Sequence, residues 1–423
     1  MRNRTTFVYI HLADGPVPAG RLDMVEDGRN SHAVFQYGAR YLSRPDRIAV
    51  DPAALPLPDP AASPQAFRSA EGFALFNGIR DAAPDGWGRY LMQKAAGAET
   101  LDEFDYLIAS GDRRVGSLAF GPDPTGGPKR TVPWGPDTSG EHLDLAALAQ
   151  AAEKIQSVDR LDPDLRRFLE AGSSLGGARP KAATDRAGQP WIAKFSAKSD
   201  SYPVCRAELG TMRLAAACGL DVPAVDLTTL LGHDIYLIQR FDRRLAGNQM
   251  NRISFASALT MLEAQEMAAY HYSYRDLADV LRRFGSEPRR DMRELFRRLG
   301  FNILVGNDDD HLRNHGFLFD GRGWRLSPLY DVVPKPRAGR EWRLILNAGA
   351  NGHEPTLANA LTGAAAFGLD REEAASMLEE LRAAVGQRWQ AAMKDAGLAA
   401  GDIERLAPCF AESGSSAWRD RAG

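Results

Sequence analysis

The chain has few of the residues that mark secreted, zinc-stapled or membrane-spanning proteins. Its 423 residues include three cysteines, Cys205, Cys218 and Cys409, and no two of them form a CxxC pair. An odd number of unclustered cysteines favours a reduced, cytoplasmic protein and argues against structural zinc. No stretch reaches the roughly 20 apolar residues of a membrane span, and the apolar run near the N-terminus is too short for a signal peptide. We therefore expect a cytoplasmic protein with no membrane partner.

An excess of charge of one sign is also lacking. The chain has 52 basic and 55 acidic residues, a formal net charge of −3. Domains that hold nucleic acid by bulk electrostatics are usually basic, so we expect any DNA contact to be indirect, through a partner. With 44% apolar and 25% charged residues the composition is that of an ordinary globular protein, and the length allows two or three domains.

An acidic loop at residues 306–314, Gly-Asn-Asp-Asp-Asp-His-Leu-Arg-Asn, is the most informative stretch. Residues 291–305 before it have apolar side chains at helical spacing, and residues 315–326 after it predict a hairpin. Three adjacent carboxylates are costly unless they share a cation or a proton. A solvated acidic turn would explain an arbitrary Asp triplet, but this loop is predicted to be held by a rigid element at each end, as catalytic loops are.

The spacing within this loop is typical of phosphoryl transfer. Asn314 follows Asp309 by five positions, as in the catalytic loop of protein kinases, where the Asp accepts the hydroxyl proton and the Asn binds Mg²⁺. Asp331 follows at a strand–turn junction. Magnesium prefers a few hard oxygen ligands and completes its shell with phosphate. We therefore predict Asp309 as the catalytic base and Asn314 and Asp331 as metal ligands.

A second group of motifs precedes this loop. Residues 172–181 read Gly-Ser-Ser-Leu-Gly-Gly-Ala-Arg-Pro-Lys, which fits a surface turn as well as a phosphate loop and is neither a Walker A sequence nor GxGxxG. Lys194 ends Trp-Ile-Ala-Lys, close to the Val-Ala-Ile-Lys strand of kinases, and a helix over residues 205–218 carries Glu208, the partner that such a lysine needs. Predicted strands follow at 222–231 and 235–239. This order is that of a kinase small lobe.

Two strings carry a more specific resemblance. GNDDDHLRNHGF at 306–317 and LSPLYDVVP at 326–334 resemble the catalytic and metal-binding motifs of the HipA family of serine/threonine kinase toxins. The family pattern is Asn-Thr-Asp-x-His-x-x-Asn, and this chain has Asp308 in place of the Thr, which adds a negative charge beside the base. Residues 239–243, Gln-Arg-Phe-Asp-Arg, are similar to the family's Glu-Arg-Phe-Asp-Arg hinge, whose backbone is expected to bind adenine.

The resemblance implies an α+β, two-lobed protein-kinase-like fold with an N-terminal β-rich subdomain and a helical large lobe. It implies ATP and Mg²⁺ as cofactors, an ion pair through Glu208, and autophosphorylation at Ser174. For His311, a structural hydrogen-bonded histidine is an equal alternative to a nucleotide contact. The residues expected to bind ATP are Gly176, Gly177, Ala178, Arg179, Lys181, Lys194, Gln239, Arg240, Phe241, His311, Arg313 and Tyr330.

The resemblance also implies a toxin restrained by a HipB-like helix-turn-helix antitoxin that makes the DNA contact. Its protein target would be a translation component such as an aminoacyl-tRNA synthetase, notably glutamyl-tRNA synthetase. Two alternatives remain. A small-molecule kinase of the aminoglycoside type usually has His two positions before the catalytic Asp, where this chain has Asn307. A catalytically silent DNA-bound regulatory partner is disfavoured by the intact Lys194, Asp309, Asn314 and Asp331.

Pro/Gly content and periodicity predict how the chain is divided. Strands are expected at 6–12, 20–25 and 32–37, helices near 74–80, 86–94 and 101–109, and an extended connector at 51–64, with Trp87 in the core. The large lobe is expected to be helix-rich over 251–284 and 371–396. The predicted parts are a β-rich subdomain (1–125), a Pro/Gly linker (126–140), small-lobe elements (141–240), a helical large lobe (241–410) and a mobile tail (411–423).

Overall fold

The computed structural model divides into two compact units. Unit 1 comprises residues 1–198, 230–235 and 242–256, and unit 2 comprises 199–229, 236–241 and 257–423. No helix among the described residues is long and apolar enough to cross a membrane. The described residues are 2–27, 30–59, 61, 63–97, 101–132, 144–158, 168–173, 177–247, 249–336, 342–414 and 418.

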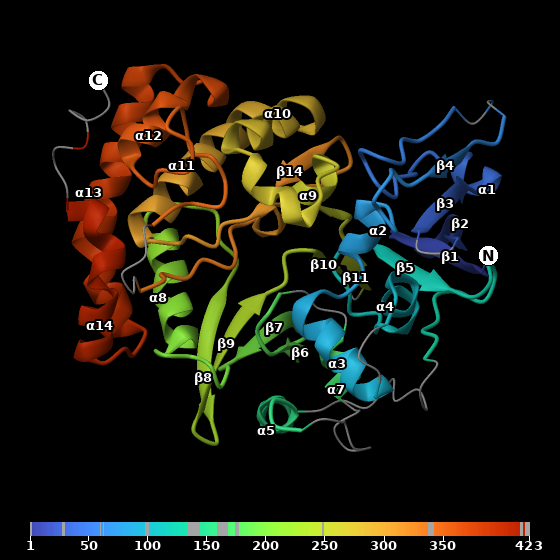
Figure 1. Ribbon diagram of the computed structural model, residues 1–423, viewed down its shortest axis with the longest axis horizontal. Helices are drawn as coiled ribbons and strands as arrows, with labels where there is room; N and C mark the ends of the chain where they lie inside the picture. The colour runs from blue at the N-terminus through green and yellow to red at the C-terminus, as the bar shows by residue number, and fades with distance from the viewer. Residues whose placement is uncertain are drawn as a thin grey trace. The chain divides into compact units, whose positions relative to one another are not determined.

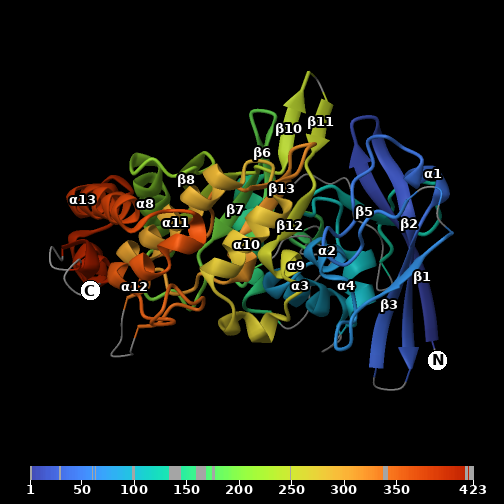
Figure 2. The same cartoon turned by 90° about the horizontal axis from the view of Figure 1, so that it is seen from above.

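Unit 1 begins with an antiparallel sheet of five strands in the order β4-β3-β2-β1-β5. The long strands β1–β3 lie side by side in Figure 2, and the three predicted N-terminal strands are confirmed. A bulge between Val8 and Tyr9 shifts the register of β1 against β2. The sheet strands are β1 (Arg2–Leu12), β2 (Gly15–Asp27), β3 (Asn30–Tyr37), β4 (Ala66–Arg68) and β5 (Leu118–Gly121).

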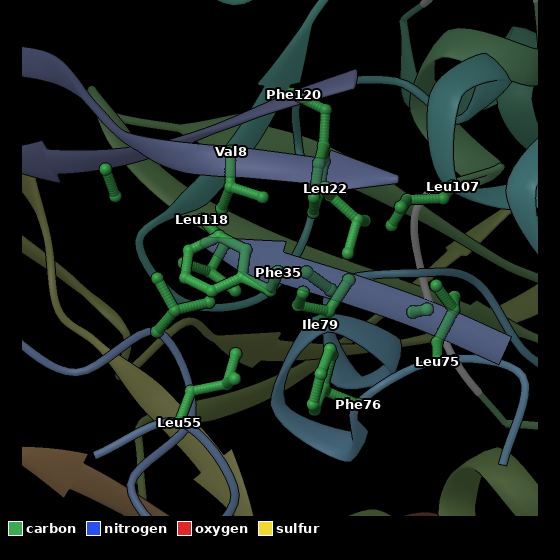
Figure 3. Packing of buried hydrophobic residues seen from close by; sticks show 14 of the residues in the cluster. Val8, Leu22, Phe35, Leu55, Leu75, Phe76, Ile79, Leu107, Leu118 and Phe120 are labelled. Carbon is green, nitrogen blue, oxygen red and sulfur yellow. The ribbon is translucent and has the colours of Figure 1, made fainter. Parts of the chain in front are cut away.

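One face of this sheet builds the core shown in Figure 3. Val8, Leu22 and Phe35 alternate inward from three strands and pack with Ile79 of helix α2 (Asn77–Asp81). The Phe35 ring fits there because Gly20 has no side chain, since a β-carbon would come within 2.5 Å of the ring. Burial of such apolar side chains supplies most of the stabilisation of the sheet.

The remaining elements of unit 1 largely follow the predictions, because three helices and the paired strands 181–186 and 189–195 form where the sequence patterns indicated. The exceptions are 51–55, a tight turn where an extended connector was expected, and 251–257, where helix was expected but residues 251–252 and 255–257 lie in strands. These elements are α1 (Ala39–Leu42), α3 (Gly86–Ala96), α4 (Glu103–Ala109), α5 (Leu145–Ile155), α7 (Phe168–Gly172), β6 (Lys181–Arg186), β7 (Gln189–Phe195), β10 (Arg243–Ala246) and β11 (Gln249–Arg252).

Unit 2 is mostly helical, as predicted, and α8, α11 and α13 lie next to one another in Figure 1. Pro288 opens α11 and Gly306 closes it in the left-handed conformation, at φ 66°. Strands β8 (Val225–Leu230), β9 (His233–Gln239) and β12 (Phe255–Ser257) fall at the boundaries between the units. The other elements are α8 (Val204–Ala217), α9 (Ala258–Met261), η1 (Glu266–His271), α10 (Tyr274–Phe284), α11 (Pro288–Val305), η2 (Leu312–Asn314), β13 (Gly316–Phe319), β14 (Trp324–Leu326), α12 (Leu357–Thr362), η3 (Ala364–Phe367), α13 (Arg371–Asp395), α14 (Ala400–Leu406) and η4 (Ala407–Gly414).

The C-terminal segment differs from the predicted mobile tail. Helix η4 continues to Gly414, and Trp418 is fully buried with its indole N–H donating to Glu379 at 2.8 Å. An apolar ring with a satisfied N–H explains why Trp418 is buried. The other predicted domain boundaries stay predictions, because residues 133–140 of the expected linker lie outside the described residues.

Candidate functional site

The acidic loop begins where α11 ends. Gly306 turns the chain out of the helix, and η2 closes the loop eight residues later at Asn314. The amide nitrogen of Asn314 donates to the backbone carbonyl of Asp309 at 3.0 Å, and its own N–H donates to the carbonyl of His311 at 2.8 Å. Asn314 is only 7% exposed. Asp309 and Asn314 are therefore held together by a direct hydrogen bond.

The carboxylate of Asp309 faces a lysine that the sequence analysis missed. The Asp309 side chain is 54% exposed, and its Oδ2 lies 3.0 Å from Nζ of Lys335. The same ammonium lies 3.4 Å from Oδ1 of Asp308, a buried oxygen that has no hydrogen-bond partner in the described structure. The backbone N–H of Lys335 donates to the carbonyl of Gly306 at 3.2 Å. Lys335 therefore offsets the charge that Asp308 adds beside the base.

The buried carboxylate of Asp310 ties the loop to the protein interior. Its Oδ2 accepts hydrogen bonds from the hydroxyl of Tyr274 and, at 3.0 Å, from Nε2 of His315. The Tyr274 hydroxyl in turn accepts from Asn302 at 3.1 Å, and Asn302 accepts from the amide of Asn307 at 3.0 Å. All five side chains are buried. This chain of bonds joins α10 and α11 to both ends of the loop.

The electrostatics of this network keep Asp310 charged. Burial alone would raise the pKa of Asp310, but the neighbouring His315 and the hydrogen bonds from His315 and Tyr274 hold it below its usual value. Burial and the Asp310 carboxylate raise the pKa of Tyr274 well above normal, so its hydroxyl stays a donor. The network is therefore a fixed support for the loop.

Asp331 has a strained backbone. Its φ is 60°, a conformation that non-glycine residues adopt rarely and that Asp tolerates better than most. Beside it, the hydroxyl of Tyr330 donates to the carbonyl of Arg313 at 2.6 Å, and the Tyr330 ring lies 5.4 Å from that of Phe241. Three of the residues predicted to bind ATP, Phe241, Arg313 and Tyr330, thus come together next to Asp331.

Glu208 and Asp331 lie around one buried phenol. Glu208 on α8 is 1% exposed. Burial, Glu208 and Asp331 together raise the pKa of Tyr236 on β9 well above normal. At the predicted hinge, Arg240 is buried, and the N–H of Gln239 donates to the carbonyl of Ala224 at 2.9 Å. An adenine contact at Gln239 would therefore have to use its carbonyl.

In unit 1, two of the predicted lysines share one face of the β6–β7 hairpin. Lys181 pairs directly with Lys194, and each is 7% exposed. A β-carbon on Gly177, where φ is 86°, would collide with Nζ of Lys181. Ala178 is exposed and Arg179 half-buried, while Gly176 and Ser174 lie outside the described residues. The lysine and glycine chemistry expected of a phosphate site therefore converges at Gly177.

The start of α3 holds this glycine, a role that the sequence analysis missed. The N–H of Gly177 donates to the carboxylate of Asp85, and the N–H of Trp87 donates to the carbonyl of Gly177 at 2.8 Å. Gly86 has no room for a β-carbon against Gly177. Trp87 is 4% exposed, so its predicted place in the core is confirmed. The pattern Pro-Asp-Gly-Trp-Gly was the available signal.

The donor set of unit 2 fits magnesium. Because the nitrogen of the Asn314 amide is bound to Asp309, its oxygen is the group left to accept a cation, and Asp331 supplies a carboxylate. Both are the hard oxygen donors that Mg²⁺ prefers. Among the described residues no group of three or more His, Cys, Asp or Glu side chains is arranged to hold a metal.

These features define a protein of the kinase-like class: a helical unit that carries the Asp–Asn loop and a following Asp, and a lysine-bearing hairpin in the other unit. Two family models place it more closely: one of the HipA-like C-terminal domain matches residues 173–389, just over half of the chain, and one of the HipA N-terminal domain matches 10–121. The chain belongs to the HipA family.

Individual relatives agree at low identity. The chain is 28% identical over 293 residues to Y4mE of Sinorhizobium fredii, whose name classes it provisionally as a kinase; the alignment covers 63% of this chain and 65% of Y4mE. It is 28% identical over 142 residues to the serine/threonine-protein kinase toxin HipA of Shewanella oneidensis, covering 30% of this chain and 33% of that protein. The chain thus spans less than two thirds of either relative.

A solved structure establishes the fold. HipA in the complex of HipA, HipB and operator DNA from Shewanella oneidensis superposes with a TM-score of 0.69 at 17% identity, covering 98% of this chain and 99% of that one. The predicted α+β protein-kinase-like fold is confirmed.

Proposed function

We propose that this protein is an ATP- and Mg²⁺-dependent serine/threonine protein kinase. The observation that carries the proposal is the bond between the Asn314 amide and the Asp309 carbonyl, which fixes a proton acceptor and a metal ligand in one short loop. Positioning and electrostatic stabilisation account for most of the catalysis of phosphoryl transfer. The buried hydrogen bond from Tyr274 to Asp310 fixes the loop and so provides the positioning.

Each residue has a separate task in this proposal. Asp309 orients the substrate hydroxyl and accepts its proton, and Lys335 at 3.0 Å offers a positive charge beside the reacting oxygen. Asn314 and Asp331 would hold Mg²⁺, which when bound neutralises phosphate charge. In unit 1, Gly177 and its neighbours with Lys181 and Lys194 bind nucleotide phosphates.

The remaining residues surround the nucleotide. Gln239, Arg240 and Phe241 are proposed to border the adenine. Arg313 and Tyr330 are proposed to lie near it because they are joined to each other and to Phe241. His311 is half-buried, and its Nδ1 has no hydrogen-bond partner in the described structure, which favours a ligand contact over a purely structural role.

We further propose that the chain is the toxin of a toxin–antitoxin pair. Its partner would be a HipB-like helix-turn-helix antitoxin, through which alone it reaches DNA. The support is family membership, together with the solved relative that is in complex with HipB and operator DNA. The substrate would be a protein of translation, such as glutamyl-tRNA synthetase, and its phosphorylation would arrest cell growth. The reaction would take place in the cytoplasm.

Autophosphorylation is proposed at Ser174, in agreement with the family pattern. Its neighbour Ser173 is 1% exposed, and its hydroxyl oxygen accepts a hydrogen bond from the N–H of Gly111 at 3.3 Å. A phosphate on Ser173 would therefore have to break buried packing. Phosphate on Ser174 would add about −1.5 to −2 charges beside the expected phosphate loop and would repel ATP. The modified enzyme should then bind ATP more weakly.

The test is incubation of the purified chain with radiolabelled ATP and Mg²⁺, alone and with cell extract, followed by phosphosite mapping. We expect label on Ser174 in the chain alone and on one or a few extract proteins. Label confined to small molecules would support an aminoglycoside-type kinase instead. Absence of label in both reactions, with a folded protein, would support a catalytically silent partner. Label on Ser173 alone would contradict only the autophosphorylation step.

A further inference from the structure

Unit 2 contains a cavity of about 990 Å³ whose lining includes none of the residues assigned above to catalysis or nucleotide binding. It is bordered by the C-terminal end of α8, the first half of α11 and the middle of α13, three helices that lie together in Figure 1. Six arginines line it: Arg290, Arg293, Arg297, Arg298, Arg325 and Arg388. A volume of this size suits a ligand as large as a nucleotide.

Some of these arginines are neutralised by carboxylates. Arg325 makes two bonds to Asp291, at 2.7 and 2.8 Å. Arg293 pairs with Glu373, and Arg290 pairs with Glu287 at 3.2 Å. The lining also carries the carboxylates of Asp221, Asp291, Glu294 and Glu380, so six guanidiniums stand against four carboxylates. Glu287 and Glu373, which pair with Arg290 and Arg293 without lining the cavity, bring the carboxylates to six, so the charges balance in number and the arginines differ in whether a carboxylate pairs with them.

Two of the six arginines have no carboxylate partner within the described residues. Arg297 donates to the backbone carbonyls of Cys218 and Gly219, at 2.6 and 2.9 Å, but within the described residues it pairs with no carboxylate. The same holds for Arg388, which is exposed at the rim of the cavity. Both arginines act on the buried thiol of Cys218. Burial raises the pKa of that thiol, and the nearby charges of Arg388 and Arg297 oppose the rise. Two like charges so close together favour an anion shared between them.

A third arginine is buried with part of its fork unused. Arg298 is 1% exposed, and its Nε donates to Glu294 at 2.9 Å. Its Nη2 is buried and has no hydrogen-bond partner among the described residues. An unsatisfied buried donor costs about 1–3 kcal/mol, so such a group on a cavity wall indicates a ligand that completes it.

We propose that this cavity binds a small polyanion carrying two or more phosphate groups. Arg298 and Arg297 would hold one phosphate from the cavity wall, and Arg388 would hold another from the rim. Planar guanidiniums that offer parallel N–H groups recognise phosphate oxygens in pairs. The proposal is independent of the kinase assignment, because it uses no residue of the Asp309 loop.

The experiment is calorimetric titration of the whole protein with tripolyphosphate in EDTA, which removes Mg²⁺. We expect one equivalent to bind in the cavity, besides any that binds at Lys181 and Lys194. Arg388→Ala should weaken binding at least about tenfold, because an exposed side chain that supplies one of the charges is lost. Arg297→Lys keeps the charge but loses the fork, and we expect it to weaken binding as well. Arg289→Ala is the matched control, since Arg289 is an exposed arginine of α11 that does not line the cavity.

Further arms separate the alternatives. Lys194→Ala should leave this binding within about twofold of wild type, and citrate should bind at least about tenfold more weakly than tripolyphosphate. Equal affinity in Arg388→Ala and Arg289→Ala would overturn the proposal, as would loss of binding in Lys194→Ala alone. Citrate binding as tightly as tripolyphosphate would overturn the phosphate class. Circular dichroism of each variant shows that its fold is intact.

Discussion

The carboxylate of Asp309 is exposed, so its substitution separates chemistry from folding. Asp309→Asn is nearly isosteric but cannot accept a proton, and we expect phosphoryl transfer to fall by about 10²–10⁴. Because the side chain is 54% exposed, the free energy of unfolding should change by less than about 0.5 kcal/mol. Transfer of radiolabelled phosphate and urea unfolding measure the two effects.

Asp308→Asn is the control for this change. It removes the other carboxylate that faces Lys335 and leaves the proposed base intact. We expect it to keep activity within about tenfold of wild type. Asp309→Asn activity within a few fold of wild type would contradict the assignment of the base, whatever Asp308→Asn does.

Asp331 offers a substitution that leaves its unusual backbone in place. Asn tolerates the left-handed conformation as well as Asp does, so Asp331→Asn at φ 60° removes the charge without adding strain. A site left with one carboxylate fewer should bind Mg²⁺–nucleotide at least about tenfold more weakly, while binding without Mg²⁺ changes little. Calorimetric titration with and without Mg²⁺ tests this. An unchanged Mg²⁺ dependence would count against Asp331 as a ligand.

At the scale of elements, the contact between α10 and the acidic loop depends on one hydroxyl. Tyr274→Phe leaves buried Asp310 with one donor fewer and Asn302 without its acceptor. We expect a loss of about 1–3 kcal/mol in the free energy of unfolding, and slower phosphoryl transfer because the loop is less fixed. Tyr272→Phe is the control, since that hydroxyl forms no hydrogen bond with the described residues. Equal stability of the two variants would refute the supporting role of the network.

The turn that leads into the N-terminal helices should make stability depend on pH. Burial raises the pKa of Asp51 to about 6, although its carboxylate accepts from the N–H groups of Ala53, Ala54 and Gly78. Because the pKa of Asp51 in the folded protein lies above the unfolded value near 3.8, the protonated side chain adds to the free energy of unfolding. This stabilisation is fully present below about pH 4 and is lost as the pH rises through 6. The loss amounts to at most about 3 kcal/mol.

Asp51→Asn removes this titration. Between pH 4 and 7 the free energy of unfolding of the wild type should therefore fall relative to that of Asp51→Asn, measured by urea unfolding at each pH. Exposed Asp59, substituted by Asn, serves as the control and should follow the wild type. Parallel curves for wild type and Asp51→Asn would show that Asp51 does not titrate in this range.

At the scale of the whole molecule, local pattern predicted what is local. The helix before the acidic loop and the hairpin after it depend on residues close in the sequence. The missed features join distant residues: Tyr274 reaches Asp310, and Asp85 reaches Gly177. The periodicity of apolar residues along the chain does not indicate which distant residues form hydrogen bonds. The same reason explains Trp418, whose burial depends on Glu379 and α13 instead of on its polar neighbours.

The last prediction concerns the cell. If the chain is a kinase toxin, its expression should arrest growth, and Asp309→Asn at equal protein level should not, because the proposed proton acceptor is lost. Arg289→Ala, an exposed position at the opposite end of α11 from the loop, should arrest growth like the wild type. Co-expression of a HipB-like helix-turn-helix protein should restore growth by binding the chain, which a pull-down would detect. Growth curves after induction give the answer. Arrest by Asp309→Asn as strong as by the wild type would mean that toxicity does not come from phosphorylation.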